Sequence, residues 1–216
     1  MADFLTIAIP TGRLGKQTLK RFNMAGMLEN YEKGSRKLIL IDGQYRLRFL
    51  FVKPVDVMTY VTNKVADIGV VGKDQILEEQ ANIYEIMDLK FGQCMLAIAG
   101  FDHTPLSKQN GVLSIATKYP HYTERFFLER NQQVNIIPLN GSVELAPLVG
   151  LADVIVDIVE TGATLKENGL KVLQEMIPIS ARLIANRVSY RFKIQAIEQL
   201  IERLNKGVGV GNETNR

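Results

Sequence analysis

The sequence has few of the residues from which disulfides and metal centres are built. Its 216 residues include one cysteine, Cys94, and two histidines, His103 and His121. A single cysteine excludes an intramolecular disulfide and a cysteine metal cluster. The two histidines lie in polar, turn-like contexts without the spacing of metal ligands. We therefore expect no metal site built from protein side chains.

The sequence also lacks a strong charge imbalance and long apolar runs. Its net charge of +3 is too small to indicate nucleic acid or a membrane surface, but it suits a phosphate-rich small molecule. No segment approaches the roughly 20 apolar residues of a membrane span, and the apolar run at the start is too short for a signal peptide. These absences predict a cytoplasmic protein that binds neither nucleic acid nor membrane.

The sequence does contain a strand, a glycine turn and a helical pattern in succession within residues 151–173. Residues 154–159 are apolar and mostly β-branched, as in a buried strand of a parallel sheet. The chain then turns at 161–162, and over 165–173 leucines recur with the spacing of one helix face. We therefore expect a strand–turn–helix unit here.

This turn has the composition of a binding site for a phosphorylated sugar. Backbone N–H groups at a helix start favour an anion, and Thr161 and Thr164 add hydroxyl donors while Gly162 admits a ligand closely. Asp157 and Glu160 would not help to bind bare phosphate, but carboxylates accept hydrogen bonds from vicinal sugar hydroxyls. The alternative is an ordinary turn with both acids solvated, because short motifs give many false positives.

Two further units of this kind are expected. One joins a strand over 4–9 to a helix over 14–24 through a turn that holds Arg13. Arginine at a helix start opposes the dipole, which favours a role in anion binding, although a surface arginine is the alternative. The other joins a strand ending near Gly72 to a helix near 75–79. Three such units predict an α/β sheet with ligand loops at the carboxyl ends of its strands.

The remaining elements follow from hydrophobic periodicity. We expect strands over 35–41, 47–52, 112–117, 134–139 and 181–185, extended segments over 83–90 and 93–100, and helices over 55–63, 121–130, 144–148 and 193–204.

A nine-residue pattern makes the turn after residue 159 far more specific. Its members, at fixed spacing, are Glu144, Gly150, Ala152, Ile155, Asp157, Thr161, Gly162, Thr164 and Leu165. The pattern resembles the signature of the ATP phosphoribosyltransferases, the family that opens histidine biosynthesis. The stretch 10–14 resembles the family's N-terminal P-K-G-R-L, with Thr11 in place of the usual Lys. The resemblance extends from Phe4 to about Leu204.

The resemblance implies an α/β fold of two lobes, of the type II periplasmic-binding-protein kind, with the active site in the cleft between them. Lobe I would be discontinuous, formed by 1–90 and 180–216, and lobe II would be 91–179 and carry the phosphoribosyl-binding loop. Long-form members have an additional C-terminal regulatory domain, for which residues after 204 leave no room. The resemblance therefore implies a short-form catalytic subunit that forms a homodimer within a larger hetero-oligomer, with a regulatory subunit resembling a histidyl-tRNA synthetase.

The implied reaction joins N1 of ATP to C1 of phosphoribosyl pyrophosphate and releases pyrophosphate. Mg²⁺ would come mainly with the pyrophosphate group. Arg13 and Arg36 are the catalytic candidates, because a guanidinium matches phosphate oxygens. The expected substrate-binding residues are Gly12, Asp67, Lys73, Asp74, Glu144, Asp157, Glu160, Thr161, Gly162, Ala163, Thr164 and Leu165.

Some of these assignments have structural alternatives. Asp67, Lys73 and Asp74 either face the substrate or stabilise the start of a helix. Glu144 either contacts substrate or caps the helix that follows Ser142.

Two other functions compete with this one. A non-catalytic binding module would share the two-lobed fold but would not account for the whole signature together with Arg13. A phosphoribosyltransferase for a free purine or pyrimidine has two adjacent acids before the turn, whereas Asp157 and Glu160 are three residues apart. Fold analogy alone does not separate these functions, and the site residues favour the first.

Overall fold

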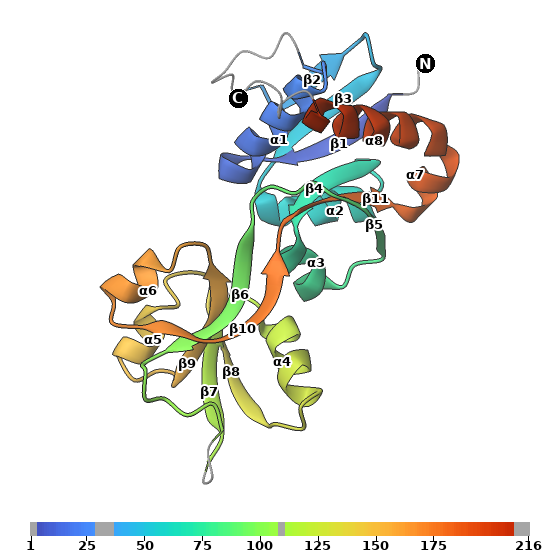
Figure 1. Ribbon diagram of the computed structural model, residues 1–216. Coiled ribbons are helices and arrows are strands. Elements are labelled where there is room, and N and C mark those ends of the chain that lie inside the picture. Colours follow the sequence, from blue (N-terminus) through green and yellow to red (C-terminus); the bar gives the residue numbers. More distant parts are fainter. Residues whose placement is uncertain (1–3, 29–36, 108–110, 210–216) are drawn as a thin grey trace. The chain divides into compact units, whose positions relative to one another are not determined.

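The structure is a computed structural model that describes residues 4–28, 37–107 and 111–209 (Figure 1). The chain forms two compact units. Unit 1 consists of Met1–Gln75, Ala81–Gly92 and Ser180–Arg216, and unit 2 of Ile76–Gln80 and Gln93–Ile179. The lobe boundaries expected from the sequence differ from these units at 76–80 and 91–92. That the units are independent lobes stays a prediction.

Unit 1 is built on a six-stranded mixed sheet. Its strands, in spatial order, are β2 (Ile39–Asp42), β3 (Leu47–Val52), β1 (Leu5–Pro10), β4 (Ile68–Gly72), β11 (Ala181–Asn186) and β5 (Ile83–Asp88). β1 is parallel to β3 and β4, whereas β2, β11 and β5 are each antiparallel to their neighbours. Its helical elements are α1 (Gly12–Met24), η1 (Pro54–Asp56), α2 (Val57–Thr62), the start of α3 (Lys73–Glu79), α7 (Arg187–Phe192) and α8 (Ile194–Gly209).

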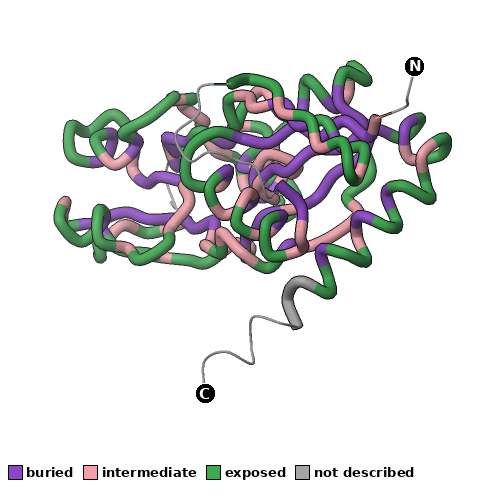
Figure 2. The backbone as a smooth tube through the Cα atoms, turned by 90° about the horizontal axis from the view of Figure 1, so that it is seen from above, coloured by how far each residue is buried: buried purple, intermediate pink, exposed green. Residues whose placement is uncertain are grey.

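Helices cover both faces of this sheet. On one face, Phe22 of α1 meets Phe49 of β3 edge-to-face with ring centroids 5.5 Å apart, in a core to which α8 adds Ile197. On the other face α2 packs against Gly69, where a Cβ would lie 2.8 Å from side-chain atoms of α2. Every residue of β1 is buried, as expected for a central parallel strand, and such buried backbone is purple in Figure 2.

Unit 2 contains a five-stranded sheet with the order β10 (Lys171–Ile179), β6 (Cys94–Gly100), β9 (Val154–Val159), β7 (Leu113–Thr117) and β8 (Val134–Pro138). β9 is parallel to β7 and antiparallel to β6. The helix α4 (Pro120–Leu128) packs on one face through Phe126 and Phe127. The short helices α5 (Leu145–Leu148) and α6 (Ala163–Glu167) cover the other, where Ala146 and Leu165 join the core.

The helical pattern expected over 165–173 is wrong beyond residue 167. α6 ends at Glu167, and Gly169 has a left-handed φ of +69°. The Leu170 N–H donates to the Leu165 carbonyl at 2.8 Å, a C-terminal cap that glycine permits. The chain then forms β10, which pairs antiparallel with β6. Leucine spacing did not distinguish one helix turn followed by a strand from a longer helix.

Other differences are smaller. The strand expected over 35–41 is observed from Ile39 to Asp42, and residues 35–36 lie outside the described part. Most other expected elements match to within two or three residues. The short helix α7 was not expected.

Asp88, at the end of β5, supplies a pH-dependent contribution to stability. Burial acts to raise its pKa, but hydrogen bonds from Lys90 and Ser180 and the charge of Arg182 lower the pKa from 3.8 to about 2. Because the folded pKa lies below the unfolded one, this contribution is complete above about pH 4 and is lost as the pH falls toward 2. We expect the wild type to be more stable than Asp88→Asn in urea denaturation at pH 6. The difference should shrink between pH 4 and pH 2, and a constant difference would contradict this assignment.

Candidate active site

The turn after β9 lines a pocket in unit 2. The pocket has a volume of about 200 Å³ and is lined by Ala99, Glu144, Ile155 and the stretch 157–165. β9 is paired on both edges, by β6 and β7, so the turn at its carboxyl end starts from a fixed strand. The structure thus brings together all of the unit 2 residues that the sequence predicted to bind substrate.

The turn needs glycine at position 162. Gly162 has φ +72° and ψ 5°, a left-handed conformation that residues with a Cβ rarely adopt. Its carbonyl accepts the Lys166 N–H at 3.0 Å, and the Ala163 N–H lies 3.4 Å from the Thr161 hydroxyl. Gly162, the residue before α6, has no side chain that could cap the helix, and the first turn has no acidic residue. A bound anion could therefore interact with the N–H groups at this helix start.

Two carboxylates share the pocket with this turn. Side chains alternate between the faces of a strand, and Ile155 and Val159 of β9 both pack in the core beneath α5 and α6. Asp157 lies between them on the same face, and Glu160 follows directly and is exposed. Both acids line the pocket, where carboxylate oxygens can accept hydrogen bonds from ligand hydroxyls.

Glu144 reaches the same pocket from α5. It is the residue before the helix, but its side chain makes no capping hydrogen bond, and it lines the pocket instead. This placement favours a substrate contact over the capping alternative.

Ala99 is a pocket residue that the sequence reasoning missed. It is buried on β6 directly opposite Ile155 of β9, and it lines the pocket. Its methyl group leaves space that a larger side chain would fill. Ala97, Ala99 and Gly100 are small, but the sequence alone did not indicate which of them would face the pocket.

The turn after β1 in unit 1 also has glycines where the backbone conformation or close packing requires them. Gly12 begins α1 with φ +82°, and a Cβ at Gly15 would lie 1.8 Å from the Pro10 carbonyl oxygen. Thr11 makes no side-chain cap to α1, whose first turn has no acidic residue. Arg13 is exposed at this helix start. An anion bound here would meet both the helix start and a guanidinium.

Lys73 and Asp74 lie at the same edge of the sheet. They follow β4, the parallel neighbour of β1, so their turn and the turn after β1 both lie at carboxyl ends. The Lys73 ammonium pairs with Glu85. Asp74 is buried, and its Oδ1 would lie 2.0 Å from a Cβ at Gly72, so a side chain at position 72 would displace this carboxylate. That these two residues bind substrate stays a prediction.

Asp67 lies at the opposite, amino-terminal end of β4. Its Oδ2 accepts the Thr6 N–H at 2.8 Å and the Lys193 ammonium at 2.9 Å, and Lys193 also donates to the Phe4 carbonyl at 2.9 Å. The carboxylate is buried. These contacts favour a structural role for Asp67, and the structure does not place it with the turn residues.

Some expectations concern parts that the structure does not describe. Arg36 lies in the undescribed stretch 29–36. Among the described residues, no three or more His, Cys, Asp or Glu side chains form a group suited to a metal ion. The described helices include none long and apolar enough to cross a membrane.

Comparison with known proteins gives a consistent result. Residues 53–206 match the family HisG, ATP phosphoribosyltransferase. The chain is 49% identical over 199 residues to the ATP phosphoribosyltransferase of Clostridioides difficile, an alignment that covers 92% of this chain and 96% of that protein.

Solved structures extend the comparison to the fold. A chain of the ATP phosphoribosyl transferase (HisG:HisZ) complex from Thermotoga maritima is 35% identical, with a TM-score of 0.82 and coverage of 95% of this chain and 99% of that chain. The periplasmic aliphatic sulphonate binding protein SsuA from Escherichia coli is 12% identical, with a TM-score of 0.61 and coverage of 99% and 75%. The fold is therefore the two-sheet α/β fold of periplasmic-binding-protein type.

Proposed function

Because the chain belongs to the ATP phosphoribosyltransferase family, we propose that the pocket beside β9 binds the 5′-phosphate and ribose of phosphoribosyl pyrophosphate. The activity is the transfer of the phosphoribosyl group to N1 of ATP with release of pyrophosphate, the first step of histidine biosynthesis. The interlobe cleft that the resemblance implied as the place of this reaction stays a prediction.

The observation that carries the proposal is the convergence of a phosphate-type turn with three carboxylates. The stretch 160–165 offers backbone N–H groups and two threonine hydroxyls to the phosphate. Asp157 and Glu160 would accept hydrogen bonds from the 2′- and 3′-hydroxyls, and Glu144 would contact the sugar from α5. A site for bare phosphate would not need these acids. A phosphorylated ribose, by contrast, would use the N–H and hydroxyl donors for its phosphate and the carboxylates for its hydroxyls.

The chemistry asks mainly for positioning and for charge stabilisation. Adenine N1 has a free lone pair, so no nucleophilic side chain is needed. Positive charge develops on the ribose at C1 as the bond to pyrophosphate breaks, and negative charge develops on the departing pyrophosphate. In this proposal Arg13 and Arg36 neutralise the pyrophosphate and the ATP phosphates through paired N–H donors.

Mg²⁺ enters this proposal as part of the substrate. Mg²⁺ keeps several waters and prefers phosphate oxygens with few protein ligands. We assign no protein ligand to it.

The chain is a short-form catalytic subunit, and it covers 99% of the matched chain of the Thermotoga maritima HisG:HisZ complex. We propose that its regulatory partner is a subunit resembling a histidyl-tRNA synthetase, and that a homodimer of this chain is the unit of assembly. The Thermotoga maritima relative belongs to a HisG:HisZ complex, which supports a heteromeric partner. The cytoplasmic location expected from the sequence belongs to the same proposal.

A direct test is pyrophosphate release with ATP, phosphoribosyl pyrophosphate and Mg²⁺, with and without the regulatory subunit. We expect turnover that requires both ATP and phosphoribosyl pyrophosphate and that rises when the partner is added. A folded chain that neither turns over in either condition nor binds phosphoribosyl pyrophosphate would overturn the site assignment.

A more specific prediction concerns Glu160. Glu160→Gln removes a charged acceptor of a ribose hydroxyl, so the KM for phosphoribosyl pyrophosphate should rise by about 5- to 30-fold, or about 1–2 kcal/mol. The KM for ATP should change little. Glu167→Gln, at the exposed end of α6, is the matched control and should leave both constants unchanged. An equal effect of the two substitutions would contradict the assignment of Glu160.

A further inference from the structure

Two neighbouring hollows are lined by successive residues of β5, the edge strand of the unit 1 sheet, and of the segment that follows it. One hollow of about 650 Å³ is lined by residues 84–86 of β5, by Tyr190 and Arg191 of α7 and by Ile194. A second, of about 580 Å³, is lined by residues 87–91 and by side chains of α1 and α8. Both are bounded by α8, near its start and near its end. We call residues 84–91 with the facing side chains of α1, α7 and α8 the β5 groove.

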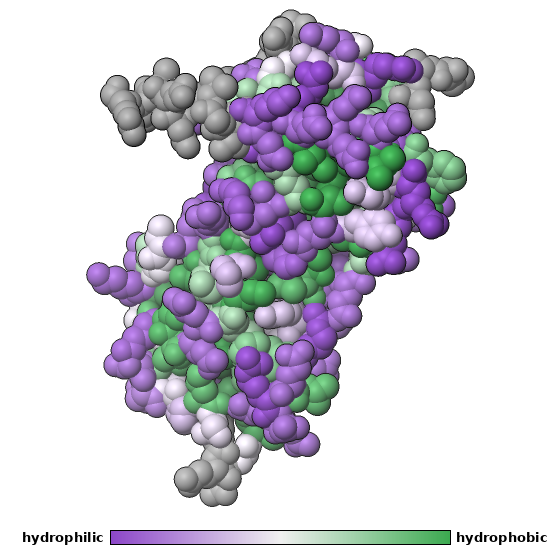
Figure 3. Space-filling model, turned by 45° about the vertical axis from the view of Figure 1, so that its right-hand side comes forward, coloured by the Kyte–Doolittle hydropathy of each residue, from purple (hydrophilic) through white to green (hydrophobic). Residues whose placement is uncertain are grey.

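Apolar and aromatic side chains are exposed along the β5 groove. Phe192, at the end of α7, does not itself line either hollow but directly follows the lining residue Arg191. It has 85% of its surface exposed, the largest fraction among the large hydrophobic residues described. Tyr84 stacks edge-to-face with Tyr190 at 5.4 Å, and the Arg187 guanidinium lies 4.9 Å from the Tyr84 ring centre. Aromatic residues and arginine are the types enriched where proteins bind each other. Figure 3, coloured by the hydropathy of each residue, shows hydrophobic residues (green) at the surface of the molecule among hydrophilic ones (purple).

The charges of the β5 groove are predominantly positive. Its lining includes four basic side chains, which are Lys20, Arg21, Lys90 and Arg191, and two acidic ones, Glu85 and Asp88. Both acids already face Arg182, at 3.2 and 3.4 Å, and each also pairs with a lysine. Since the acidic charge is neutralised within the chain, the groove presents net positive charge to a partner.

Two polar atoms in the groove also lack a partner among the described residues. The Gln17 Oε1 and the Arg21 Nε are buried and make no hydrogen bond there. Burial lowers the pKa of Arg21, because the charged form is poorly solvated. An acidic group brought into the groove would relieve that cost.

We propose that the β5 groove is the docking surface for a face of the regulatory subunit that carries acidic and exposed apolar side chains. The inference rests on the heteromeric partner proposed above and names the surface of this chain that binds it. A second copy of the chain is the less suitable occupant. A two-fold contact places the same patch on both sides, so groove cations would face groove cations, whereas an acidic partner is complementary.

The test compares groove variants with matched controls. Arg191→Glu reverses a groove charge, and Phe192→Ser removes the exposed ring; both side chains are exposed, so folding should be preserved. Lys64→Glu and Leu128→Ser make equivalent changes on exposed residues that do not line the groove. Association of each full-length chain with the purified regulatory subunit is measured by sedimentation velocity at low and high salt, with circular dichroism as the check of folding.

We expect each groove variant to weaken association with the regulatory subunit at least tenfold, while both controls bind like the wild type. The wild-type affinity should also fall as salt is raised. Wild-type-like binding by both groove variants would overturn the assignment of the groove as the docking surface, while leaving the partner assignment intact. No association of the wild-type chain with the regulatory subunit would overturn both. Groove variants that lose only self-association would assign the surface to a second copy and overturn the proposal.

Discussion

Arg13→Ala is expected to lower the turnover number by about 30- to 1,000-fold, or about 2–4 kcal/mol of barrier. The arginine is exposed at the start of α1, where an acidic residue or a side-chain cap would stabilise the helix and neither is present. Because a positive charge at a helix start opposes the helix dipole, removing the arginine should not destabilise the fold. The expected loss arises because the guanidinium would bind negative charge that grows in the transition state, as pyrophosphate leaves. Steady-state kinetics with both substrates saturating measures the effect.

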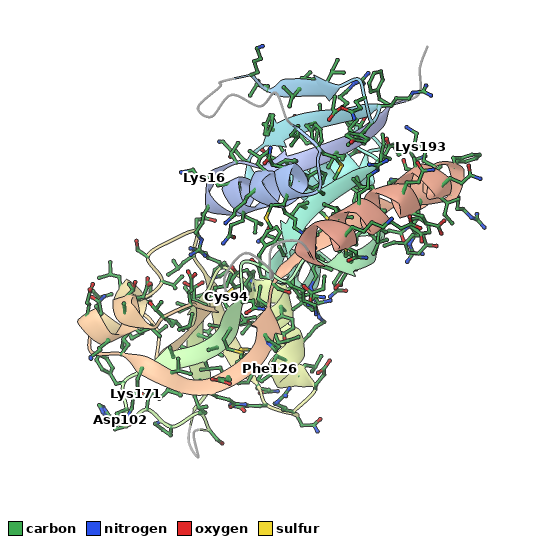
Figure 4. The ribbon with its side chains drawn as sticks, turned by 45° about the horizontal axis from the view of Figure 1, so that its top comes forward. Lys16, Cys94, Asp102, Phe126, Lys171 and Lys193 are labelled. Carbon is green, nitrogen blue, oxygen red and sulfur yellow. The ribbon has the colours of Figure 1, made fainter. Side chains whose placement is uncertain are left out.

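The matched control for Arg13 is Lys16→Ala, on the same helix and also exposed (Figure 4). It removes one positive charge about one turn further from the β1 turn, so turnover should change less than threefold. Arg36→Ala is expected to resemble Arg13→Ala. If Arg13→Ala retains wild-type turnover, or if Lys16→Ala loses as much, the assignment of Arg13 to the departing pyrophosphate is wrong.

The turn at 160–165 could be predicted from the sequence because its parts are local. A β-branched strand, a glycine that the backbone requires and the hydroxyls of residues 161 and 164 lie within a dozen residues. The structure has Gly162 in the left-handed conformation and Asp157 on the pocket side of β9. The strand period of two was enough to place Asp157 and Ile155 on one face.

Features that depend on distant segments could not be predicted in this way. Residues 171–179 form a strand because they pair with the otherwise unpaired edge of β6. The sequence of this segment alone does not identify that pairing partner. The sequence likewise did not indicate that Ala99 would face the pocket, since this depends on its pairing with Ile155. For Asp67, the local pattern left open whether it faces substrate or stabilises the fold, and its partner Lys193 lies 126 residues away.

Asp67→Ala is expected to lower the free energy of unfolding by about 3 kcal/mol. The substitution leaves the Thr6 N–H buried without its acceptor. It also removes the carboxylate from the Lys193 ammonium, which keeps its hydrogen bond to the Phe4 carbonyl. Asp67 and Lys193 side chains are 10% and 21% exposed, so water replaces the lost partner poorly. Urea denaturation at neutral pH measures the change, and KM values of the folded enzyme should stay unchanged.

A double-mutant cycle separates this pair from a general effect of losing an acid. Asp67→Ala combined with Lys193→Met should cost less than the sum of the two single changes, because the double variant also removes the ammonium that has lost its carboxylate. The control is Asp102→Ala in unit 2, which breaks an ion pair with Lys171 in which the side chains are 77% and 52% exposed. The two lysines and Asp102 are labelled in Figure 4. That control should cost less than about 1 kcal/mol, since water screens such pairs. If the losses of unfolding free energy at Asp67 and Lys193 are additive, and Asp67→Ala also raises a substrate KM, the structural assignment is wrong and Asp67 contributes to substrate binding instead.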